Sequence, residues 1–215
     1  MTRTDLGSHA WVDYDEEWMP PAEATSLFER LCEDLDWEQR PIKVFGKEVM
    51  QPRLIDWAGE LPYRYSGQTL PPKPFHPSLN SLMAKVSEVV DTPFNHVLLN
   101  LYRDGADNMG MHADDEWELG KNPTIAAVSL GAVRRFSIAK KGKGRKRIRL
   151  KLELAHGSLM VMGGTIQHRF WHGVPKQRQV ETHRINITFR QLLGPPGYRQ
   201  PRRPTPPVAN SEPQR

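Results

Sequence analysis

The stretch RINITFR, residues 184–190, alternates apolar and polar side chains in the manner of a β-strand. On an extended strand, Ile185, Ile187 and Phe189 share one face. Four polar side chains share the opposite face: Arg184, Asn186, Thr188 and Arg190. The pattern predicts a strand that packs against a core on one side and presents a polar wall on the other.

Five earlier runs also read as short strands, bounded by Gly, Asp, Asn or Pro: HVLLNLY (96–102), TIAAVSL (124–130), RRFSIAK (134–140), IRLKLEL (148–154) and SLMVM (158–162). In residues 148–154 the apolar side chains alternate with charged ones, which predicts one buried face and one wet face. We therefore expect a mostly antiparallel sheet from residue 96 onward.

Two helices are predicted ahead of these strands. The first runs from Ser26, with Glu29 placed for a capping box and apolar residues at helical spacing: Phe28, Leu31, Cys32 and Leu35. The second runs from about Ser78 and carries a longer apolar stripe: Leu79, Leu82, Met83, Val86, Val89 and Val90. Helices that precede strands and pack on the sheet define an α+β fold.

The composition bounds the kind of protein. A chain of 215 residues buries a substantial core as one domain, and its single cysteine, Cys32, rules out an internal disulfide and is expected to be buried. No apolar run reaches the roughly 18 residues of a membrane span. The acidic N-terminus has no signal-peptide pattern. We expect a monomer without membrane contact that acts inside the cell, in the cytoplasm if bacterial or the nucleus if eukaryotic.

Positive charge is concentrated in residues 140–151, which hold eight basic residues and no acidic one: Lys140, Lys141, Lys143, Arg145, Lys146, Arg147, Arg149 and Lys151. Without these eight, the net charge of +5 would be −3. Such a segment is typical of phosphate contact with a nucleic acid. The alternative is a solvated hairpin tip.

A metal site is indicated by the sequence MHADDE. His112 and Asp114 lie two residues apart, so on an extended segment both side chains reach the same side. Two histidines and one carboxylate hold Fe(II) in non-haem oxygenases, which requires a second histidine. The downstream candidates are His156, His168, His172 and His183, and a surface histidine beside an acidic loop is the alternative for His112.

The polar face of residues 184–190 requires a partner for its two arginines. If that face lines a barrel, an unpaired buried guanidinium is strongly unfavourable, so a bound carboxylate is expected. Asn100 and Tyr102 show the same two-residue spacing and are placed to hydrogen-bond the same ligand. Exposed arginines on an edge strand are the alternative.

Four motifs, in order and at similar spacing, resemble the AlkB family of dioxygenases: NLYRDGADNMGMHADDE (100–116), AHGSLMVMGG (155–164), HRFWHGVP (168–175) and HRINITFR (183–190). The resemblance runs from about Val44 to Leu193. It implies a double-stranded β-helix, or jelly roll, that uses Fe(II), 2-oxoglutarate and O2. It also implies His112, Asp114 and His172 as iron ligands, with His168 as the rival of His172. For 2-oxoglutarate it implies Asn100, Tyr102, Arg184 and Arg190, with Asn186 and Thr188 on the same wall.

Two shorter segments are similar to the subgroup that works on duplex DNA. By this resemblance, Val44, Phe45, Gly46 and Lys47 form a finger that enters the base stack, and Tyr63 and Tyr65 hold the extruded base. Asp115 and Glu116 would also meet the damaged base. The alternatives are a plain β-turn, a core pair of tyrosines and two solvated acids.

The resemblance implies a DNA repair enzyme that demethylates N-alkylated bases of the 1-methyladenine and 3-methylcytosine type, in duplex as well as single-stranded DNA. Formaldehyde, succinate and CO2 would be released. The alternatives are a dioxygenase acting on RNA, protein or small molecules, and an inactive nucleic-acid-binding module. We expect a flexible N-terminus (1–20), a dioxygenase domain (21–193) with a nucleotide-recognition segment (41–75), and a disordered Pro-rich basic tail (194–215).

Overall fold

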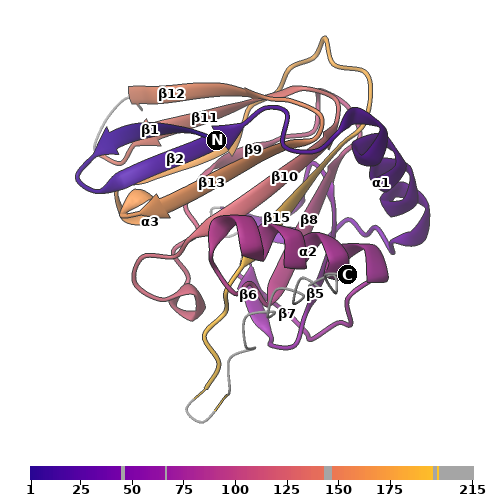
Figure 1. Cartoon of the computed structure of the whole chain (residues 1–215), viewed down its shortest axis with the longest axis horizontal. Coiled ribbons are helices and arrows are strands. Elements are labelled where there is room, and N and C mark those ends of the chain that lie inside the picture. The colour runs from indigo at the N-terminus through magenta and orange to yellow at the C-terminus, as the bar shows by residue number, and fades with distance from the viewer. Residues whose placement is uncertain (45–46, 66, 143–146, 196–197, 199–215) are drawn as a thin grey trace, which may run out of the picture.

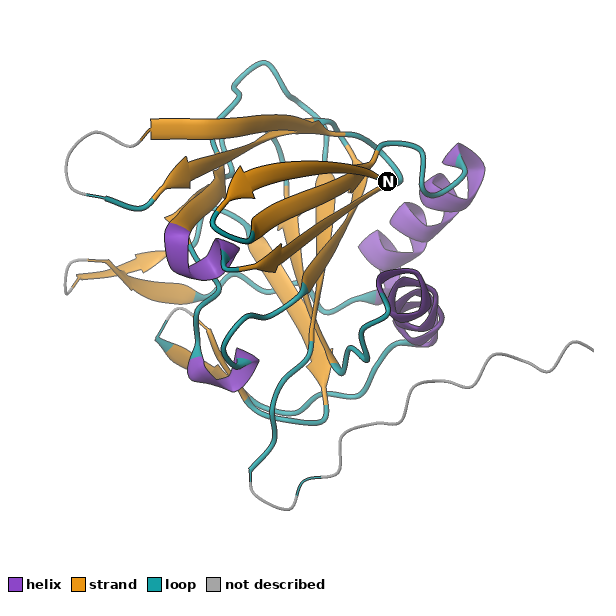
Figure 2. Cartoon of the chain, turned by 60° about the vertical axis from the view of Figure 1, so that its left-hand side comes forward, coloured by secondary structure: helices purple, strands orange, loops and turns teal. Residues whose placement is uncertain are grey.

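The structure is a computed structural model, and it describes residues 1–44, 47–65, 67–142, 147–195 and 198. Two antiparallel sheets face each other, and two long helices cover the outer face of the larger one (Figures 1 and 2). The larger sheet has seven strands in the order β1 (Thr2–Gly7), β2 (Ala10–Asp15), β13 (Ser158–Gly164), β10 (Ile125–Gly131), β15 (Arg184–Arg190), β8 (His96–Tyr102) and β5 (Leu54–Gly59).

The smaller sheet closes the other side of the sandwich. Its four strands follow the order β12 (Arg147–Leu154), β11 (Arg134–Lys140), β14 (Phe170–Val174) and β9 (Met109–His112). Two separate hairpins, β3 (Pro41–Val44) with β4 (Lys47–Met50) and β6 (Tyr63–Tyr65) with β7 (Gln68–Leu70), complete the strands. Phe45 and Gly46 lie outside the described residues. This arrangement confirms the predicted jelly roll and the α+β class.

The chain builds two cores, one on each face of the larger sheet. One core lies outside that sheet, where Ile185, Ile187 and Phe189 of β15 belong to the same buried cluster as residues of helices α1 (Pro21–Asp34) and α2 (Pro77–Val90). The second core lies between the sheets and includes Phe136 and Met160. The polar face of β15 therefore points between the sheets, as its alternation predicts.

Two local predictions are wrong. Helix α1 begins at Pro21 and not at Ser26, and its N-cap, Pro20, has no side chain that caps it. Proline fits the first turn of a helix because its missing N–H has no partner there. Residues 2–15, expected to be part of a flexible N-terminus, instead form β1 and β2, and β2 pairs with β13 and buries Ala10 and Val12.

The remaining elements agree more closely with the sequence. Helix α2 begins at Pro77, one residue before the predicted start, and its first turn is capped by His76, whose Nδ1 accepts from the amide of Ser78. Cys32 is only partly buried. Both long helices have 14 residues, and no helix in the described part of the chain is long and apolar enough to span a bilayer. Of the tail, only 194, 195 and 198 are described.

Candidate active site

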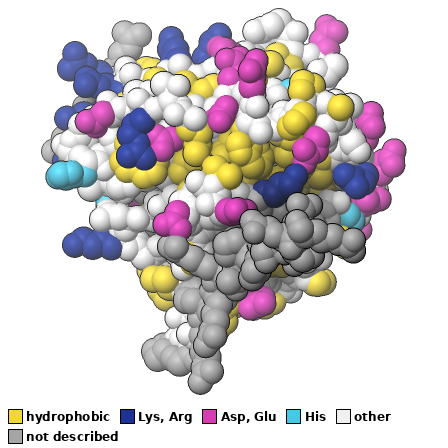
Figure 3. Space-filling model, in the orientation of Figure 1, with side chains coloured by type: hydrophobic (Ala, Val, Ile, Leu, Met, Phe, Trp, Pro, Cys, Tyr) yellow, Lys and Arg dark blue, Asp and Glu magenta, His cyan; other side chains and the backbone are white. Residues whose placement is uncertain are grey.

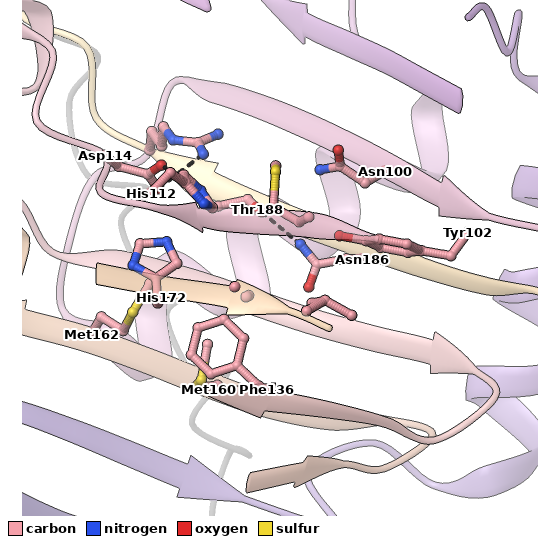
Figure 4. A pocket seen from close by; sticks show the side chains of 15 residues that line it. Asn100, Tyr102, His112, Asp114, Phe136, Met160, Met162, His172, Asn186 and Thr188 are labelled. Atoms are coloured by element: carbon pink, nitrogen blue, oxygen red, sulfur yellow. Dashed lines mark hydrogen bonds and ion pairs between the residues drawn. The ribbon is translucent and has the colours of Figure 1, made fainter. Parts of the chain in front are cut away.

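Three predicted metal ligands come together between the sheets. Antiparallel pairing of β9 and β14 sets His112 opposite His172, and their ring centroids lie 4.4 Å apart. Asp114 follows two residues later, with its Oδ1 at 3.5 Å from Nε2 of His112. One ligand atom from each of the three residues lies within 4.8 Å of those of the others (Figure 4). Two imidazoles and one carboxylate fit Fe(II) as found in non-haem oxygenases.

The protonation states suit metal binding. Burial, reinforced by the neighbouring His112, lowers the pKa of His172 to about 3, so its imidazole is neutral and keeps a lone pair. Burial alone would raise the pKa of Asp114, but Arg190 and the two histidines outweigh it and hold that pKa well below its usual range. Asp114 is therefore an ionised carboxylate although it is buried.

Neighbouring groups fix the orientation of these ligands. Arg190 donates from Nη2 to Oδ2 of Asp114 at 3.0 Å, and Gln167 accepts the backbone N–H of Asp114 at 3.0 Å. Nδ1 of His112 lies 2.9 Å from the carbonyl of Gly110. Such outer contacts hold metal ligands in place. Gln167 was missed by the sequence reasoning, because nothing local marks its contact with a residue 53 positions earlier.

His168, the rival ligand, is outside this group. It lies in the short helix α3 (Ile166–Arg169), is exposed, and contacts the carbonyl of Lys121 through Nε2. The structure therefore brings His172 rather than His168 to His112 and Asp114.

The other end of the pocket is a polar wall on two neighbouring strands. The register of β8 and β15 sets Asn100 opposite Asn186 and Tyr102 opposite Arg184. Arg184 donates to Ser129 at 2.9 Å and to Asn186 at 3.0 Å, and Asn186 donates to Thr188 at 2.7 Å. Figure 4 shows the histidines at one end of the pocket and Asn100, Tyr102 and Asn186 at the other.

This inner end carries unbalanced positive charge. Arg184 and Arg134 are fully buried, with guanidinium carbons 5.3 and 5.5 Å from the ring of Tyr102. Arg53 is also buried and acts electrostatically on Tyr102. Within the described residues none of the three forms an ion pair, and Nε and Nη1 of Arg184 have no hydrogen-bond partner. Burial lowers the pKa of Arg184 to about 10 but leaves it charged at neutral pH. An anion such as a carboxylate fits this end.

Arg53 and Arg134 were not singled out from the sequence. The sequence could have indicated that Arg134 is buried, because it lies on the same face of β11 as Phe136 and Ile138, which point into the core. Its Nη2 donates to the carbonyls of Asp107 and Pro175 at 2.8 and 2.9 Å. Arg53 had no such signal, because it precedes β5 and its contacts are long-range.

Some of the residues expected to meet a base are buried, and others are exposed. Tyr63 and Tyr65 are buried with ring centroids 6.4 Å apart, so they pack as a core pair in this structure. Burial, together with Asp114, raises the pKa of Glu116, whose carboxylate and the hydroxyl of Tyr63 influence each other. Asp115 is half exposed and pairs with Lys141 at 3.0 Å.

The basic segment is described only in part. Lys143, Arg145 and Lys146 lie outside the described residues, whereas Lys140 and Arg147 are exposed on adjacent strands. Because Ile138 pairs with His172, Lys140 lies two residues beyond the metal end of the pocket. Figure 3 shows several Lys and Arg side chains on the side where β12 begins. In the finger segment, Lys47 is exposed on β4, Val44 ends β3, and Phe45 and Gly46 are outside the described residues.

The comparisons with known proteins agree with this geometry. The model of the 2OG-Fe(II) oxygenase superfamily matches residues 12–190. The chain is 42% identical over 181 residues to the alpha-ketoglutarate-dependent dioxygenase alkB homolog 3 of Bos taurus, which covers 81% of this chain and 63% of that protein. It is 39% identical over 182 residues to the DNA oxidative demethylase ALKBH2 of Mus musculus, covering 80% of this chain and 76% of that protein. The solved structure of OsALKBH1 covers 84% of this chain and 97% of its own, with a TM-score of 0.60 and 15% identity, and supports the fold.

The chain therefore belongs to the 2OG-Fe(II) oxygenase superfamily. Within it, the match to ALKBH2 places the chain in the AlkB family. The superfamily implies Fe(II), 2-oxoglutarate and O2. The metal end of the pocket provides the donor set, and at the inner end the guanidinium group of Arg184 lies against Tyr102. The chain spans 63% of the length of the bovine and human alkB homolog 3 proteins that it matches.

Proposed function

We propose that this protein is an Fe(II)- and 2-oxoglutarate-dependent dioxygenase that oxidatively demethylates N-alkylated DNA bases of the 1-methyladenine and 3-methylcytosine type. One observation carries the proposal. The pocket has a His–Asp–His donor set at one end and a polar wall at the other, and the buried guanidinium groups of Arg184 and Arg134, which form no ion pair within the described residues, lie against Tyr102 of that wall. This is the pairing that a metal and a dicarboxylate cosubstrate need.

The residues divide into three roles. His112, Asp114 and His172 would hold Fe(II), and Arg190 keeps the carboxylate of Asp114 ionised and oriented. Arg184 would receive the distal carboxylate of 2-oxoglutarate, assisted by the other polar side chains of the wall: Asn100, Tyr102, Asn186 and Thr188. Among the described residues, Nε and Nη1 of Arg190 also have no hydrogen-bond partner, so this residue retains donors for the cosubstrate.

When bound, Fe(II), 2-oxoglutarate and O2 would supply the oxidation that releases an N-methyl group as formaldehyde, with succinate and CO2 as the other products. The apolar floor, which includes Phe136, Met160 and Met162, limits water around the reacting carbon. The protein thus contributes positioning and a dry pocket.

A nucleic acid is the substrate that the surroundings support best. The relatives include proteins named DNA oxidative demethylase, and exposed basic side chains lie near the metal end of the pocket. An alkylated base that no longer pairs is easily turned out of the helix toward that end. Asp115 and Glu116, next to the metal ligand Asp114, are the proposed contacts there, and Lys47, exposed on β4, is a further proposed contact with the nucleic acid.

The decisive experiment incubates the protein anaerobically with Fe(II), 2-oxoglutarate and an oligonucleotide that carries one 1-methyladenine, and then admits O2. We expect the oligonucleotide to lose the mass of one methylene group, with formaldehyde and succinate in equal amounts. Parallel arms with methylated RNA and methylated peptides test the alternative substrates. Succinate formation with none of the substrates demethylated would reject the DNA assignment, and binding without succinate would indicate an inactive binding module.

We also propose that the enzyme accepts duplex DNA, with residues 44–47 as a finger that fills the gap left by the flipped base. The segment VFGK and the identity to ALKBH2 support this. Phe45→Ala should then reduce repair of a methylated duplex more than repair of the same single strand, because stacking is lost only in the duplex. Val49→Ala is the control, since Val49 is exposed on β4 of the same hairpin. Equal losses on both substrates would remove the finger assignment.

Two further expectations remain proposals. We propose that the enzyme works as a monomer, because one chain provides both ends of the pocket, and sedimentation velocity tests this. We propose that it acts inside the cell, where its DNA substrate is found, and cell fractionation tests this.

A further inference from the structure

Arg53 has no contact with the metal ligands, yet its guanidinium is fully engaged beside the cosubstrate wall. The residue is 3% exposed. Its Nε donates to Oδ1 of Asn100 at 2.7 Å, Nη1 to the carbonyl of Asn108 at 3.2 Å, and Nη2 to the hydroxyl of Tyr65 at 2.6 Å. Arg53 therefore joins β8, the loop that follows it and the β6–β7 hairpin.

The contact with Asn100 decides which end of its amide faces the pocket. The oxygen and nitrogen of an amide side chain have nearly the same shape, so hydrogen-bond partners select between two orientations. A guanidinium only donates, and Arg53 therefore takes the oxygen of Asn100. The Nδ2 donor is left for the pocket, and within the described residues it makes no other hydrogen bond. A donor suits a carboxylate ligand, whereas the flipped amide would present an acceptor and repel it.

The contact with Tyr65 gives this tyrosine a role in the interior. Its hydroxyl accepts from Arg53 and lies 3.4 Å from Oε1 of Gln51, to which it donates. The side chain is only 7% exposed. Both of its polar contacts are thus made with groups that are buried alongside it rather than with the pocket mouth.

We infer that Arg53 is a positioning residue that turns the amide donor of Asn100 toward 2-oxoglutarate, and that the hydroxyl of Tyr65 acts through Arg53 on cosubstrate binding. This inference rests on the proposed function. It gives the hydroxyl of Tyr65, a residue expected from the resemblance to hold the base, a role in the cosubstrate site.

The test measures 2-oxoglutarate binding by titration calorimetry to the Mn(II)-loaded protein, without O2 or nucleic acid. Arg53→Gln should raise the Kd about tenfold, because it removes the hydrogen bond to Asn100, and Tyr65→Phe about threefold, because it removes a hydrogen bond that holds Arg53. Asn100→Ala should cost much less in the Arg53→Gln background than in the wild type, because both act through one contact. Tyr65→Phe should leave the Kd for a methylated oligonucleotide, measured without 2-oxoglutarate, unchanged.

The controls remove similar groups elsewhere. Arg135→Gln removes a guanidinium that pairs with Glu153 on the surface, and Tyr198→Phe removes a hydroxyl that donates to Glu60. Both should bind 2-oxoglutarate as the wild type does. If Arg53→Gln does not fold, Arg53→Lys and Tyr65→Phe provide milder tests, and their thermal unfolding confirms that they are folded.

Three results would overturn the inference while the wild type still binds 2-oxoglutarate. The first is an unchanged Kd of 2-oxoglutarate in both Tyr65→Phe and the Arg53 variant, and the second is additive losses of 2-oxoglutarate affinity when the Arg53 variant is combined with Asn100→Ala. The third is weaker oligonucleotide binding in Tyr65→Phe with an unchanged Kd of 2-oxoglutarate. A wild-type protein that does not bind 2-oxoglutarate would instead reject the proposed function itself. The two failures are therefore distinguishable.

Discussion

The two ends of the pocket handle charge in opposite ways. At the metal end, the buried carboxylate of Asp114 is matched by the buried guanidinium of Arg190 at 3.0 Å. At the inner end, Arg184, Arg53 and Arg134 surround Tyr102, and none of them forms an ion pair within the described residues. The buried charges of the metal end are paired before any ligand binds, whereas those of the inner end are paired only when an anion binds.

This difference separates the roles of the two arginines of β15, which look equivalent in sequence. Arg190 serves the metal ligand, and Arg184 faces the uncompensated end. Metal affinity and cosubstrate affinity should therefore respond to different substitutions. Substitutions at each end of the pocket test that separation.

Loss of a metal ligand should have the largest effect. His172→Ala, like His112→Ala or Asp114→Ala, should weaken Mn(II) binding by more than about a hundredfold and abolish turnover, because even the outer partners of metal ligands are worth ~10–100-fold. His168→Ala is the matched control, since His168 lies outside the donor set. Mn(II) titration followed by electron paramagnetic resonance measures the affinity. If His168→Ala loses the metal and His172→Ala keeps it, the ligand assignment is wrong.

The two arginines should separate cosubstrate from metal. Arg184→Gln should raise the Kd of 2-oxoglutarate by about tenfold to a hundredfold, the range for a charge-assisted hydrogen bond, and leave Mn(II) affinity nearly unchanged. Arg190→Gln should weaken Mn(II) binding, because Asp114 loses its partner. Titration calorimetry with each ligand measures both constants. Identical profiles for the two variants would erase the distinction between the two ends.

Acid should destabilise the metal end, where buried imidazoles lie, and spare the arginines of the inner end. His96 is fully buried beside Tyr63, and burial, with a contribution from Arg190, lowers its pKa to about 3. Because the unfolded chain binds the proton more tightly, the stability from neutral His96 is complete above about pH 6.5 and is lost as the pH falls toward about 3. Between pH 6.5 and pH 5 the loss should be ~2 kcal/mol.

His96→Leu tests this, since it keeps a similar volume and removes the titrating group. Neither ring nitrogen of His96 has a hydrogen-bond partner within the described residues, so the substitution breaks no contact of this kind. Urea unfolding at pH 7 and pH 5 should give a smaller difference in the free energy of unfolding for the variant than for the wild type. Equal differences would mean that His96 contributes nothing to the acid sensitivity.

The smallest effect should be on the salt dependence of nucleic-acid binding, which depends on the basic side chains near the metal end of the pocket. Lys140→Ala combined with Arg147→Ala should reduce the slope of log K against log salt by about two, since each lost phosphate contact contributes ~0.9. Arg178→Ala is the control, because it is exposed near Gln177, which contacts the opposite end of β11 at Arg135. Fluorescence anisotropy with an unmodified oligonucleotide measures the slope. An unchanged slope in the double variant would favour the solvated-hairpin alternative.

Much of this architecture was predictable because it depends on local alternation. The six strand-like runs became β8, β10, β11, β12, β13 and β15, and the two faces of β15 point as their side chains indicate. The short strands β9 and β14 were missed because they hold glycines and histidines rather than a run of apolar residues. The β1–β2 hairpin was missed because its outer face is acidic, although Ala10, Val12 and Tyr14 alternate inward.

The local pattern of residues is enough to tell which side chains share a face of a strand, and hence that Asn100 and Tyr102 share one face and Arg184 lies on the polar face of its own strand, because backbone geometry sets that alternation. From the residue pattern, four histidines remained possible as the second histidine, and only the pairing of β14 with β9 brings His172 to His112. The pairing of Arg190 with Asp114 and the hydrogen bond of Arg53 to Asn100 also depend on the tertiary structure. These contacts span 76 and 47 positions of the sequence, respectively. Contacts at such separations depend on how the sheets pack, which no local pattern encodes.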